Sequence, residues 1–204
     1  MVRLTREQSQ ARTRARLLDA AAYVFGEKGF AAASLDEIAQ RAGYSRGAVY
    51  SNFQDKDDLF LALLEQSSNQ MVTDLEEMVA SITTIDDLVE GMRRFGRRRS
   101  PSDRRRWFLL FNEFRTYALR TPSARKRLAE HERKVRAIYE QLTVDIATHL
   151  GVALPVPASR LAAWTHATTN GVEILHELDP EAMPRETAFN GIVYFFRNLT
   201  RDSV

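Results

Sequence analysis

Apolar residues along this chain recur at spacings of three and four, which is the period of an α-helix. The stretches between the later prolines lack the alternation that marks a β-strand. All six prolines lie after residue 100, each near a predicted helix boundary, where the missing N–H is tolerated. The pattern predicts helices over residues 12–28, 34–42, 46–53, 56–80, 85–98, 101–119, 122–150, 157–178 and 184–201. We therefore expect an all-α fold of about nine helices.

Two short predicted helices and a tight turn make up residues 34–53, SLDEIAQRAGYSRGAVYSNF. Ser34 can cap the first helix, and Glu37 lies three residues later, where a capping box needs it. Gly43 stands where a helix exit needs a left-handed residue, and Ser45 can cap the second helix. This order predicts a helix-turn-helix motif.

The second of these helices has two different faces. Val49 and Phe53 are four residues apart and should face inward, whereas Arg46, Gly47 and Tyr50 should face outward. A short helix with such an exposed face suits entry into the major groove of DNA. The alternative is an ordinary pair of core helices joined by a glycine turn.

The flanking segments predict a small three-helix domain around the motif. Helix 12–28, stopped by Gly29, should lie across the back of the helix pair. Downstream, Asp55 can cap the helix that starts at Lys56, whose N-terminal amides and lysine could hold a DNA phosphate. We expect a DNA-binding domain over residues 1–56 and a second helical domain over residues 57–204.

Together these residues resemble the tetracycline-repressor-type (TetR) family of bacterial regulators. The resemblance is densest over residues 14–64 and rests on AAYVFGEKGF, on the 34–53 motif and on DKDDLF. Beyond about residue 75 it is only architectural, in length and helix order. The resemblance implies that DNA is contacted by Ser34, Ser45, Arg46, Gly47, Tyr50, Asn52 and Lys56.

The resemblance also implies a role for each of these residues. Tyr50 is similar to a recognition-helix tyrosine that packs on the DNA backbone or a base edge, and Lys56 to a phosphate-binding lysine. Arg46 and Gly47 occupy base-reading positions, where an arginine that pairs with guanine contributes roughly 1–3 kcal/mol of discrimination. The two serines and Asn52 are expected to contact phosphate or sugar, although the serines could serve only as caps.

Composition narrows the class of protein. Residues 1–56 carry a net charge of +3, the remainder carries −1, and there is no cysteine to form a disulfide or a thiolate metal site. No signal peptide or membrane-spanning run is expected, so we predict a cytoplasmic protein with no membrane partner. No catalytic motif is evident, and we expect no enzyme activity, cofactor or metal. Four early arginines, Arg3, Arg6, Arg12 and Arg14, could form a mobile minor-groove arm or simply a solvated tail.

An aromatic stripe on predicted helix 101–119 consists of Trp107, Phe111 and Phe114. Such a stripe is commonly plain core, but it can also wall a ligand cavity, which the family resemblance favours. The candidate pocket, suited to a largely hydrophobic effector, comprises Leu64, Met71, Leu75, Trp107, Phe111, Asn112, Phe114, Arg115, Tyr139, Leu142, Trp164, His166, Asn170 and Glu173.

Two further features lie in the second predicted domain. The last two helices could form half of a four-helix dimer interface, or could close the core of the protomer. The interface candidates are Ala163, Ala167, Gly171, Phe189, Ile192, Val193 and Phe196. Residues 93–106 contain eight arginines and one acid. This cluster has three interpretations: a solvated turn, a surface that attracts DNA phosphates, or a site for an anionic ligand or an acidic partner.

The function predicted from sequence is therefore a homodimeric repressor, released from a palindromic operator in double-stranded DNA by a small-molecule effector. The alternatives are a ligand-independent regulator or activator of the same fold, and a small-molecule-binding module without DNA affinity.

Overall fold

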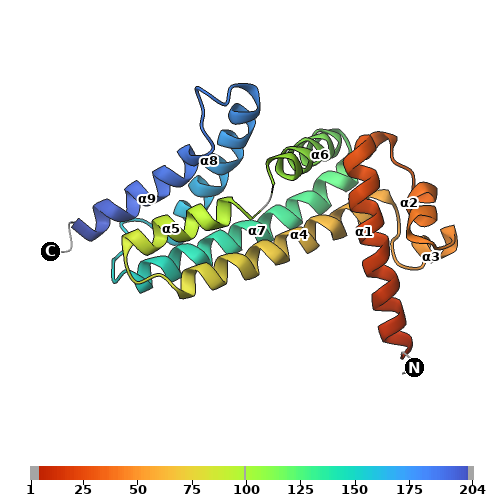
Figure 1. Cartoon of the computed structure of the whole chain (residues 1–204), viewed down its shortest axis with the longest axis horizontal. Helices are drawn as coiled ribbons and strands as arrows, with labels where there is room; N and C mark the ends of the chain where they lie inside the picture. The colour runs from red at the N-terminus through yellow and green to blue at the C-terminus, as the bar shows by residue number, and fades with distance from the viewer. Residues whose placement is uncertain (1–4, 99, 202–204) are drawn as a thin grey trace. The chain divides into compact units, whose positions relative to one another are not determined.

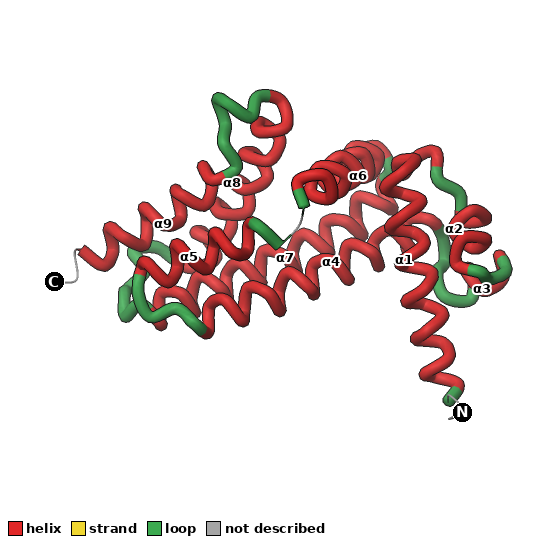
Figure 2. Tube along the Cα trace, viewed as in Figure 1, coloured by secondary structure: helices red, strands yellow, loops and turns green. Residues whose placement is uncertain are grey.

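The structure is a computed structural model of the chain, and it describes residues 5–98 and 100–201. These residues form nine α-helices and no strand, which confirms the all-α prediction (Figures 1 and 2). The helices are α1 (Arg6–Ala32), α2 (Leu35–Ala42), α3 (Arg46–Tyr50), α4 (Lys56–Ala80), α5 (Ile85–Gly96), α6 (Pro101–Arg120), α7 (Pro122–His149), α8 (Ala158–Leu178) and α9 (Glu186–Arg201). None of the described helices combines the length and hydropathy needed to cross a bilayer.

Helix α1 begins earlier than its apolar pattern predicts. Thr5 and Gln8 form a capping box, with the Thr5 hydroxyl accepting from the Gln8 N–H at 3.2 Å and Gln8 Oε1 accepting from the Thr5 N–H at 2.9 Å. Arg6, Arg12 and Arg14 are consequently helical, so the expected mobile arm is wrong for these three residues. Arg3 lies outside the described residues.

Glycine shapes two helices, ending α2 at the predicted position and kinking α1 where a stop was expected. Gly29 has φ 77° and ψ 170°, which kinks α1 and leaves only a last short turn beyond it. Gly43 ends α2 with φ 74° and ψ 29°, the left-handed conformation that glycine adopts without a Cβ penalty.

The chain folds into two compact units that differ from the predicted division at residue 56. The N-terminal unit comprises the chain up to Ser67 together with Arg106–His131, and the second unit comprises Ser68–Arg105 and the chain from Glu132 onward. The N-terminal unit continues past residue 56 because α4 supplies Leu59, Phe60 and Leu63 to its core.

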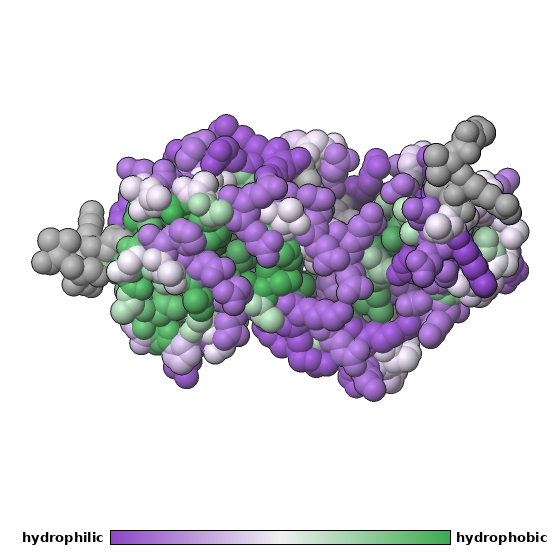
Figure 3. Space-filling model, turned by 90° about the horizontal axis from the view of Figure 1, so that it is seen from below, coloured by the Kyte–Doolittle hydropathy of each residue, from purple (hydrophilic) through white to green (hydrophobic). Residues whose placement is uncertain are grey.

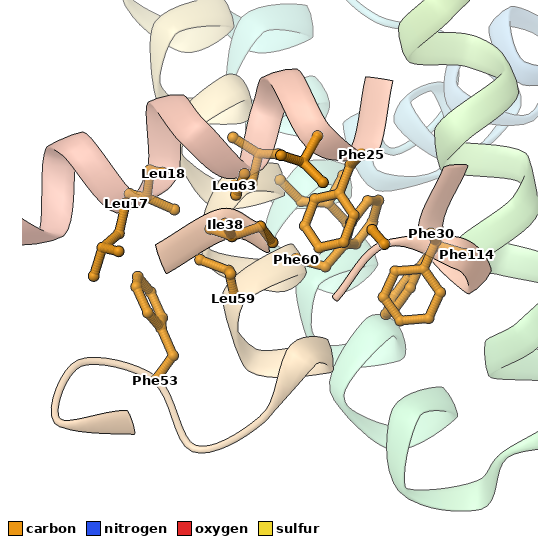
Figure 4. Close-up of a cluster of buried hydrophobic side chains, with 14 of the residues drawn as sticks. Leu17, Leu18, Phe25, Phe30, Ile38, Phe53, Leu59, Phe60, Leu63 and Phe114 are labelled. Carbon is orange, nitrogen blue, oxygen red and sulfur yellow. The ribbon is translucent and has the colours of Figure 1, made fainter. Parts of the chain in front are cut away.

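Aromatic rings fill the core of the N-terminal unit. Phe25, Phe60 and Phe114 are fully buried, and the rings of Phe60 and Phe114 stack with centroids 4.3 Å apart (Figure 4). Phe30 adds edge-on contacts to Phe60 at 5.3 Å and to Phe114 at 4.9 Å. Such geometries are favourable for aromatic pairs, so α6 is an integral part of this core. Phe114 and Leu64 are therefore buried in this core, as the plain-core reading of the aromatic stripe expects for Phe114.

The second unit has its own apolar core. Leu75, Ile82, Leu88 and Phe196 are buried in it. Figure 3 shows that hydrophobic residues also reach the surface of the second unit. Several of the exposed ones lie on α8 and α9, namely Trp164, Ile174, Leu175, Leu178 and Tyr194.

Candidate nucleic-acid interface

In the predicted motif, α2 packs on α1 and α3 packs on α2, and a serine side chain caps each of the two short helices (Figure 1). Ser34 Oγ accepts from the Glu37 N–H at 3.2 Å, and Ser45 Oγ accepts from the Ala48 N–H at 3.3 Å. Both serines are exposed, so capping leaves them accessible from outside. The reciprocal half of the predicted capping box at α2 is wrong, because Glu37 pairs with Lys28 instead, which lowers the pKa of its carboxyl.

Helix α3 has the two faces that its sequence predicts. The helix ends at Tyr50, three residues earlier than predicted. Val49 of α3 and Phe53, which follows its end, are buried at 0% and 2% exposed and anchor this segment to the core. Arg46, Gly47 and Tyr50 are exposed, and the exposed fraction of Tyr50 is 48%. Since a large aromatic at this exposure is not serving the core, these three residues form the candidate reading surface.

Two neighbours hold the guanidinium of Arg46. Its Nε lies 3.2 Å from Oδ1 of Asp36 on α2, and its Nη2 donates to the Tyr50 hydroxyl at 3.2 Å. The hydrogen bond to Tyr50, together with the nearby Asp36 charge, raises the pKa of Arg46. Arg46 is therefore a permanent cation with a defined direction, although its side chain is exposed. The role of Asp36 could not be predicted from the sequence, because an acid in the first turn of a helix is commonly a charge that complements the helix dipole.

The fold itself does not require glycine at position 47. A Cβ built there would meet only Ser45 Oγ at 3.7 Å, which is ordinary van der Waals contact. Among the described glycines, positive φ values occur at Gly29, Gly43 and Gly151 and not at Gly47. The absence of a side chain at this exposed site thus has no explanation inside the protomer.

Lys56 plays a structural role in this conformation. Its Nζ donates to the carbonyl oxygens of Phe30, Ala31 and Ala33, at 2.9, 3.1 and 3.1 Å. These three bonds use all the donors of the ammonium group and close the end of α1. A phosphate contact by Lys56, as the family resemblance implies, would require at least one of them to be exchanged.

The first turn of α4 is also occupied by protein groups. Asp55 Oδ1 accepts from the Asp58 N–H at 2.6 Å, as the sequence predicts for a cap. Arg127 pairs with Asp55 and Asp57 at 3.1 and 3.3 Å. With Asp58 also in this turn, a phosphate approaching these amides would meet carboxylates, so the structure does not favour the expected anion site here.

Asn52 turns its amide toward its own helix. Its Nδ2 donates to the Ala48 carbonyl at 2.8 Å, and its Oδ1 is buried without a hydrogen-bond partner. Its backbone carbonyl accepts from Arg14 Nη1 at 3.1 Å. This orientation differs from the phosphate or sugar contact expected of the side chain.

Further exposed arginines belong to the same unit as the reading surface. Arg14 lies over the Phe53 ring at 4.4 Å, and Arg41 lies over the Tyr23 ring at 3.2 Å. Arg12 and Arg16 are exposed on α1. Their positive charge suits contact with a phosphate backbone.

Glu113 is a further residue that the sequence analysis missed. Its carboxylate accepts from the N–H groups of Phe30 and Ala31, at 2.9 and 2.7 Å. The last turn of α1 is thereby held through its N–H groups by α6 and through its carbonyls by Lys56. No sequence pattern predicts the contact of Glu113 with α1, because the partners are more than 80 residues apart in the chain.

The predicted pocket residues divide between the two units. Leu64, Trp107, Phe111, Asn112, Phe114 and Arg115 belong to the N-terminal unit, and the remaining candidates belong to the second unit. Asn112 and Arg115 bond within α6, with Asn112 Nδ2 donating to the Phe108 carbonyl at 2.8 Å and Arg115 Nη1 donating to Asn112 Oδ1 at 3.3 Å. An open depression of about 520 Å³ on this unit is lined by Asn112, Glu113, Thr116, Tyr117 and Arg120.

In the second unit, three polar residues do come together. His166 stacks on Tyr139 with centroids 5.4 Å apart, and His166 Nε2 lies 3.2 Å from Glu132 Oε2. Asn170 is one turn along, with its Nδ2 bonded to the His166 carbonyl. Leu75 and Leu142 are buried with Met71 packed against them, Glu173 pairs with Arg185, and Trp164 is 56% exposed.

The predicted dimer residues divide by burial. Val193 and Phe196 are buried in the protomer, and Ile192 packs against the same core, as the alternative reading allowed. Ala163 and Ala167 are exposed, and Gly171 and Phe189 are half-buried. The exposed apolar side chains of α8 lie at helical spacing with these small residues.

Of the described arginines in the cluster, three form ion pairs, and a fourth bonds to a backbone carbonyl. Arg98 pairs with Asp74, Arg105 with Glu177 at 2.9 Å, and Arg106 with Glu27 at 3.2 Å, while Arg104 bonds to the Gly96 carbonyl. Arg93, Arg94 and Arg97 are exposed near the end of α5, where they complement its dipole. Arg99 lies outside the described residues.

Comparison with known proteins places the chain among bacterial regulators. The sequence profile described as "Bacterial regulatory proteins, tetR family" matches residues 17–63. The HTH-type transcriptional regulator AcrR of Shigella flexneri is 42% identical over 71 residues, which are 35% of this chain and 33% of AcrR. The HTH-type transcriptional repressor AcnR of Corynebacterium diphtheriae is 34% identical over 140 residues, which are 68% of this chain and 66% of AcnR.

A solved structure shares the fold over most of the chain. The crystal structure of a TetR transcription regulator from Haloarcula marismortui aligns with a TM-score of 0.67 at 18% identity, covering 93% of this chain and 98% of that one. The matched sequence thus spans about a third of AcrR and about two thirds of AcnR, whereas the likeness of fold extends over nearly the whole chain.

Proposed function

The chain belongs to the TetR family of bacterial regulatory proteins, and on that premise we propose that it is a DNA-binding transcriptional regulator acting as a homodimeric repressor. Members of this family are transcription regulators, so the chain is not an enzyme. A DNA ligand implies that it works in the cytoplasm.

The exposed surface of Arg46, Gly47 and Tyr50 carries the proposal. It presents a fixed cation, a bare stretch of backbone and an aromatic hydroxyl, none of which serves the core of the protomer. These groups suit contact with base edges and the DNA backbone in a major groove, with the Ser34 and Ser45 hydroxyls available for phosphate or sugar.

The proposed partner is a second copy of the chain, which would supply the second recognition helix. The exposed apolar side chains of α8, beside Ala163, Ala167 and Gly171, suit a four-helix interface with the same helices of another protomer. Two recognition helices about 34–36 Å apart would then enter successive major grooves of a palindromic operator.

A small-molecule effector is proposed to release the operator. Tyr139, His166 and Asn170 in the second unit are candidate polar groups for it. The effector must bind the two conformers of the dimer with different affinity, since otherwise it shifts nothing. Persistence of the DNA complex across a broad metabolite panel would favour a ligand-independent regulator instead.

Alanine substitution at Arg46 and Tyr50 tests the DNA-binding proposal. We expect Tyr50→Ala to weaken binding to all duplexes, whereas Arg46→Ala also relaxes sequence preference, by about 5–150-fold at one base pair. Fluorescence anisotropy on a selected duplex and on random duplex at low salt measures both effects. Arg136→Ala is the matched control, because Arg136 is an exposed arginine of α7 in the second unit. Loss of binding in this control equal to that of Arg46→Ala would contradict the assignment, and a wild-type chain that ignores duplex DNA would leave only the binding-module alternative.

The substitution Gly47→Ala tests whether glycine at this position is needed for DNA contact and not for folding. An exposed helix gains about 0.5–1 kcal/mol from alanine in place of glycine, and the added Cβ meets nothing closer than 3.7 Å. We therefore expect stability in urea to rise slightly while DNA affinity falls, because the Cβ occupies space that the duplex backbone or a base edge would fill. An unchanged affinity would show that DNA does not approach position 47.

A further inference from the structure

The pairing of Arg46 with Asp36 points to a second residue that controls sequence reading. Asp36 lies in the first turn of α2, and Arg46 lies at the first position of α3, across the turn of the motif. The side chains are 60% and 64% exposed, and their charged atoms are 3.2 Å apart. Exposed ion pairs of this kind add little to stability, so an effect on fold stability does not explain this one.

The donors of Arg46 that remain available are at its outer end. A guanidinium has five N–H groups in a fixed plane. Asp36 pairs with Nε as an opposite charge at 3.2 Å, and the Tyr50 hydroxyl accepts one N–H of Nη2. Both N–H groups of Nη1 and the second one of Nη2 stay free, and a bidentate contact with guanine O6 and N7 needs two adjacent N–H groups.

We propose that Asp36 is a positioning residue for base recognition, which directs the free end of Arg46 toward a guanine in the major groove. The proposal rests on the DNA-binding function proposed above. A long arginine side chain loses conformational freedom when it binds, and holding it in advance reduces that loss. Asp36 fixes the guanidinium plane from α2, and Tyr50 fixes it from one turn along α3.

The negative charge of Asp36 has a second effect, which is to lower the affinity for DNA of any sequence. A carboxylate close to the reading surface repels DNA phosphates, and this repulsion applies to every sequence alike. Asp36 should therefore weaken non-specific binding while it strengthens the preference for guanine. Specificity is a difference of affinities, so both effects widen the gap between the selected duplex and random duplex.

The experiment compares Asp36→Ala with the wild-type chain on duplexes selected by the wild type from a random pool. Anisotropy titrations use the selected duplex, duplexes with each base pair of the site replaced in turn, and random duplex. Asp19→Ala is the matched control, because it removes the same charge from an exposed position of α1 in the same unit. Asp36→Asn removes the charge that pairs with Arg46 Nε but keeps a side chain of nearly the same shape.

We expect Asp36→Ala to bind random duplex more tightly than the wild type and to lose about 2–10-fold of its preference at one guanine position. Asp19→Ala should keep the full preference, and Asp36→Asn should keep part of it. In an Arg46→Ala background, Asp36→Ala should cause no further loss at that position, because the group that Asp36 positions is gone.

The outcomes separate the two proposals. A wild-type chain that selects no sequence overturns the proposed function and this inference with it. A wild-type chain that selects a sequence, with an Asp36→Ala variant that keeps the same base profile, overturns the role of Asp36 alone. A loss of preference that is equally large in the Arg46→Ala background also overturns it, since Asp36 would then act by another route.

Discussion

Phe114→Ala is expected to lower the free energy of unfolding of the N-terminal unit by about 3–5 kcal/mol. The side chain is fully buried and contacts Phe30, Phe60 and Tyr117, with ring centroids 4.9, 4.3 and 5.9 Å away. Its removal deletes aromatic contacts and leaves a cavity among rigid rings that cannot easily close. The loss is a large fraction of the stability of a typical native protein, which is about 5–15 kcal/mol.

Tryptophan fluorescence can follow this unit separately. The chain has two tryptophans, Trp107 in the N-terminal unit and Trp164 in the second unit. In a Trp164→Phe background, urea unfolding monitored by Trp107 should shift to lower denaturant on Phe114→Ala. Leu119→Ala on the same helix is the control, because Leu119 is 66% exposed and its loss should cost within about 0.5 kcal/mol. Equal shifts for the two variants would contradict the core role assigned to Phe114.

Gly29→Ala is expected to be the second most damaging change. The backbone at Gly29, with φ 77° and ψ 170°, is in a region that is essentially restricted to glycine, which alone costs about 1–3 kcal/mol for another residue. A Cβ there would also lie 2.5 Å from Glu113 Oε2, and that carboxylate is held by the Phe30 and Ala31 N–H groups. The same Trp107 unfolding curve measures the effect.

Gly43 provides a matched comparison. It also has positive φ, at 74°, but nothing lies within 4 Å of its added Cβ, so Gly43→Ala should cost only about 1–2 kcal/mol. If contact with Glu113 contributes, part of the Gly29→Ala loss should disappear in a Glu113→Ala background. A smaller loss for Gly29→Ala than for Gly43→Ala would refute this account.

Helix positions could be predicted well because their signals are local. The turn at Gly43 and the caps Ser34, Ser45 and Asp55 depend on neighbouring residues, and the structure confirms them. Gly29 kinks α1 instead of stopping it, and the helix continues to Ala32. The start of α1 was missed although it is also local. Apolar periodicity does not reveal the helix start at the Thr5–Gln8 capping box, because the first turns of α1 are polar and exposed.

Side-chain partners across the fold could not be predicted in the same way. Lys56 bonds to carbonyls about 25 residues away, and Glu113 bonds to amides more than 80 residues away. Asp36 and Arg46 meet only because the turn brings two helix starts together. Spacing shows which face a residue occupies but not which residue lies opposite, so the exposed face of α3 was predictable while the groups that hold Arg46 were not.

The aromatic stripe on α6 shows the same limit. Its periodicity correctly indicated that Phe114 faces inward, but a core and a ligand cavity use the same residue types at the same spacing. Only the rings supplied by α1 and α4 distinguish the two, and these place Phe114 in the N-terminal core.

The discontinuity of the N-terminal unit also governs when it can form during synthesis. Helices α2 and α3 leave the ribosome early. Phe114 and Arg127 emerge only after residues Ser68–Arg105, which belong to the second unit. At about 5–20 residues per second, the nascent chain spends several seconds with Phe30 and Phe60 lacking their α6 partner. Chaperone capture of these rings should therefore be greatest in that interval.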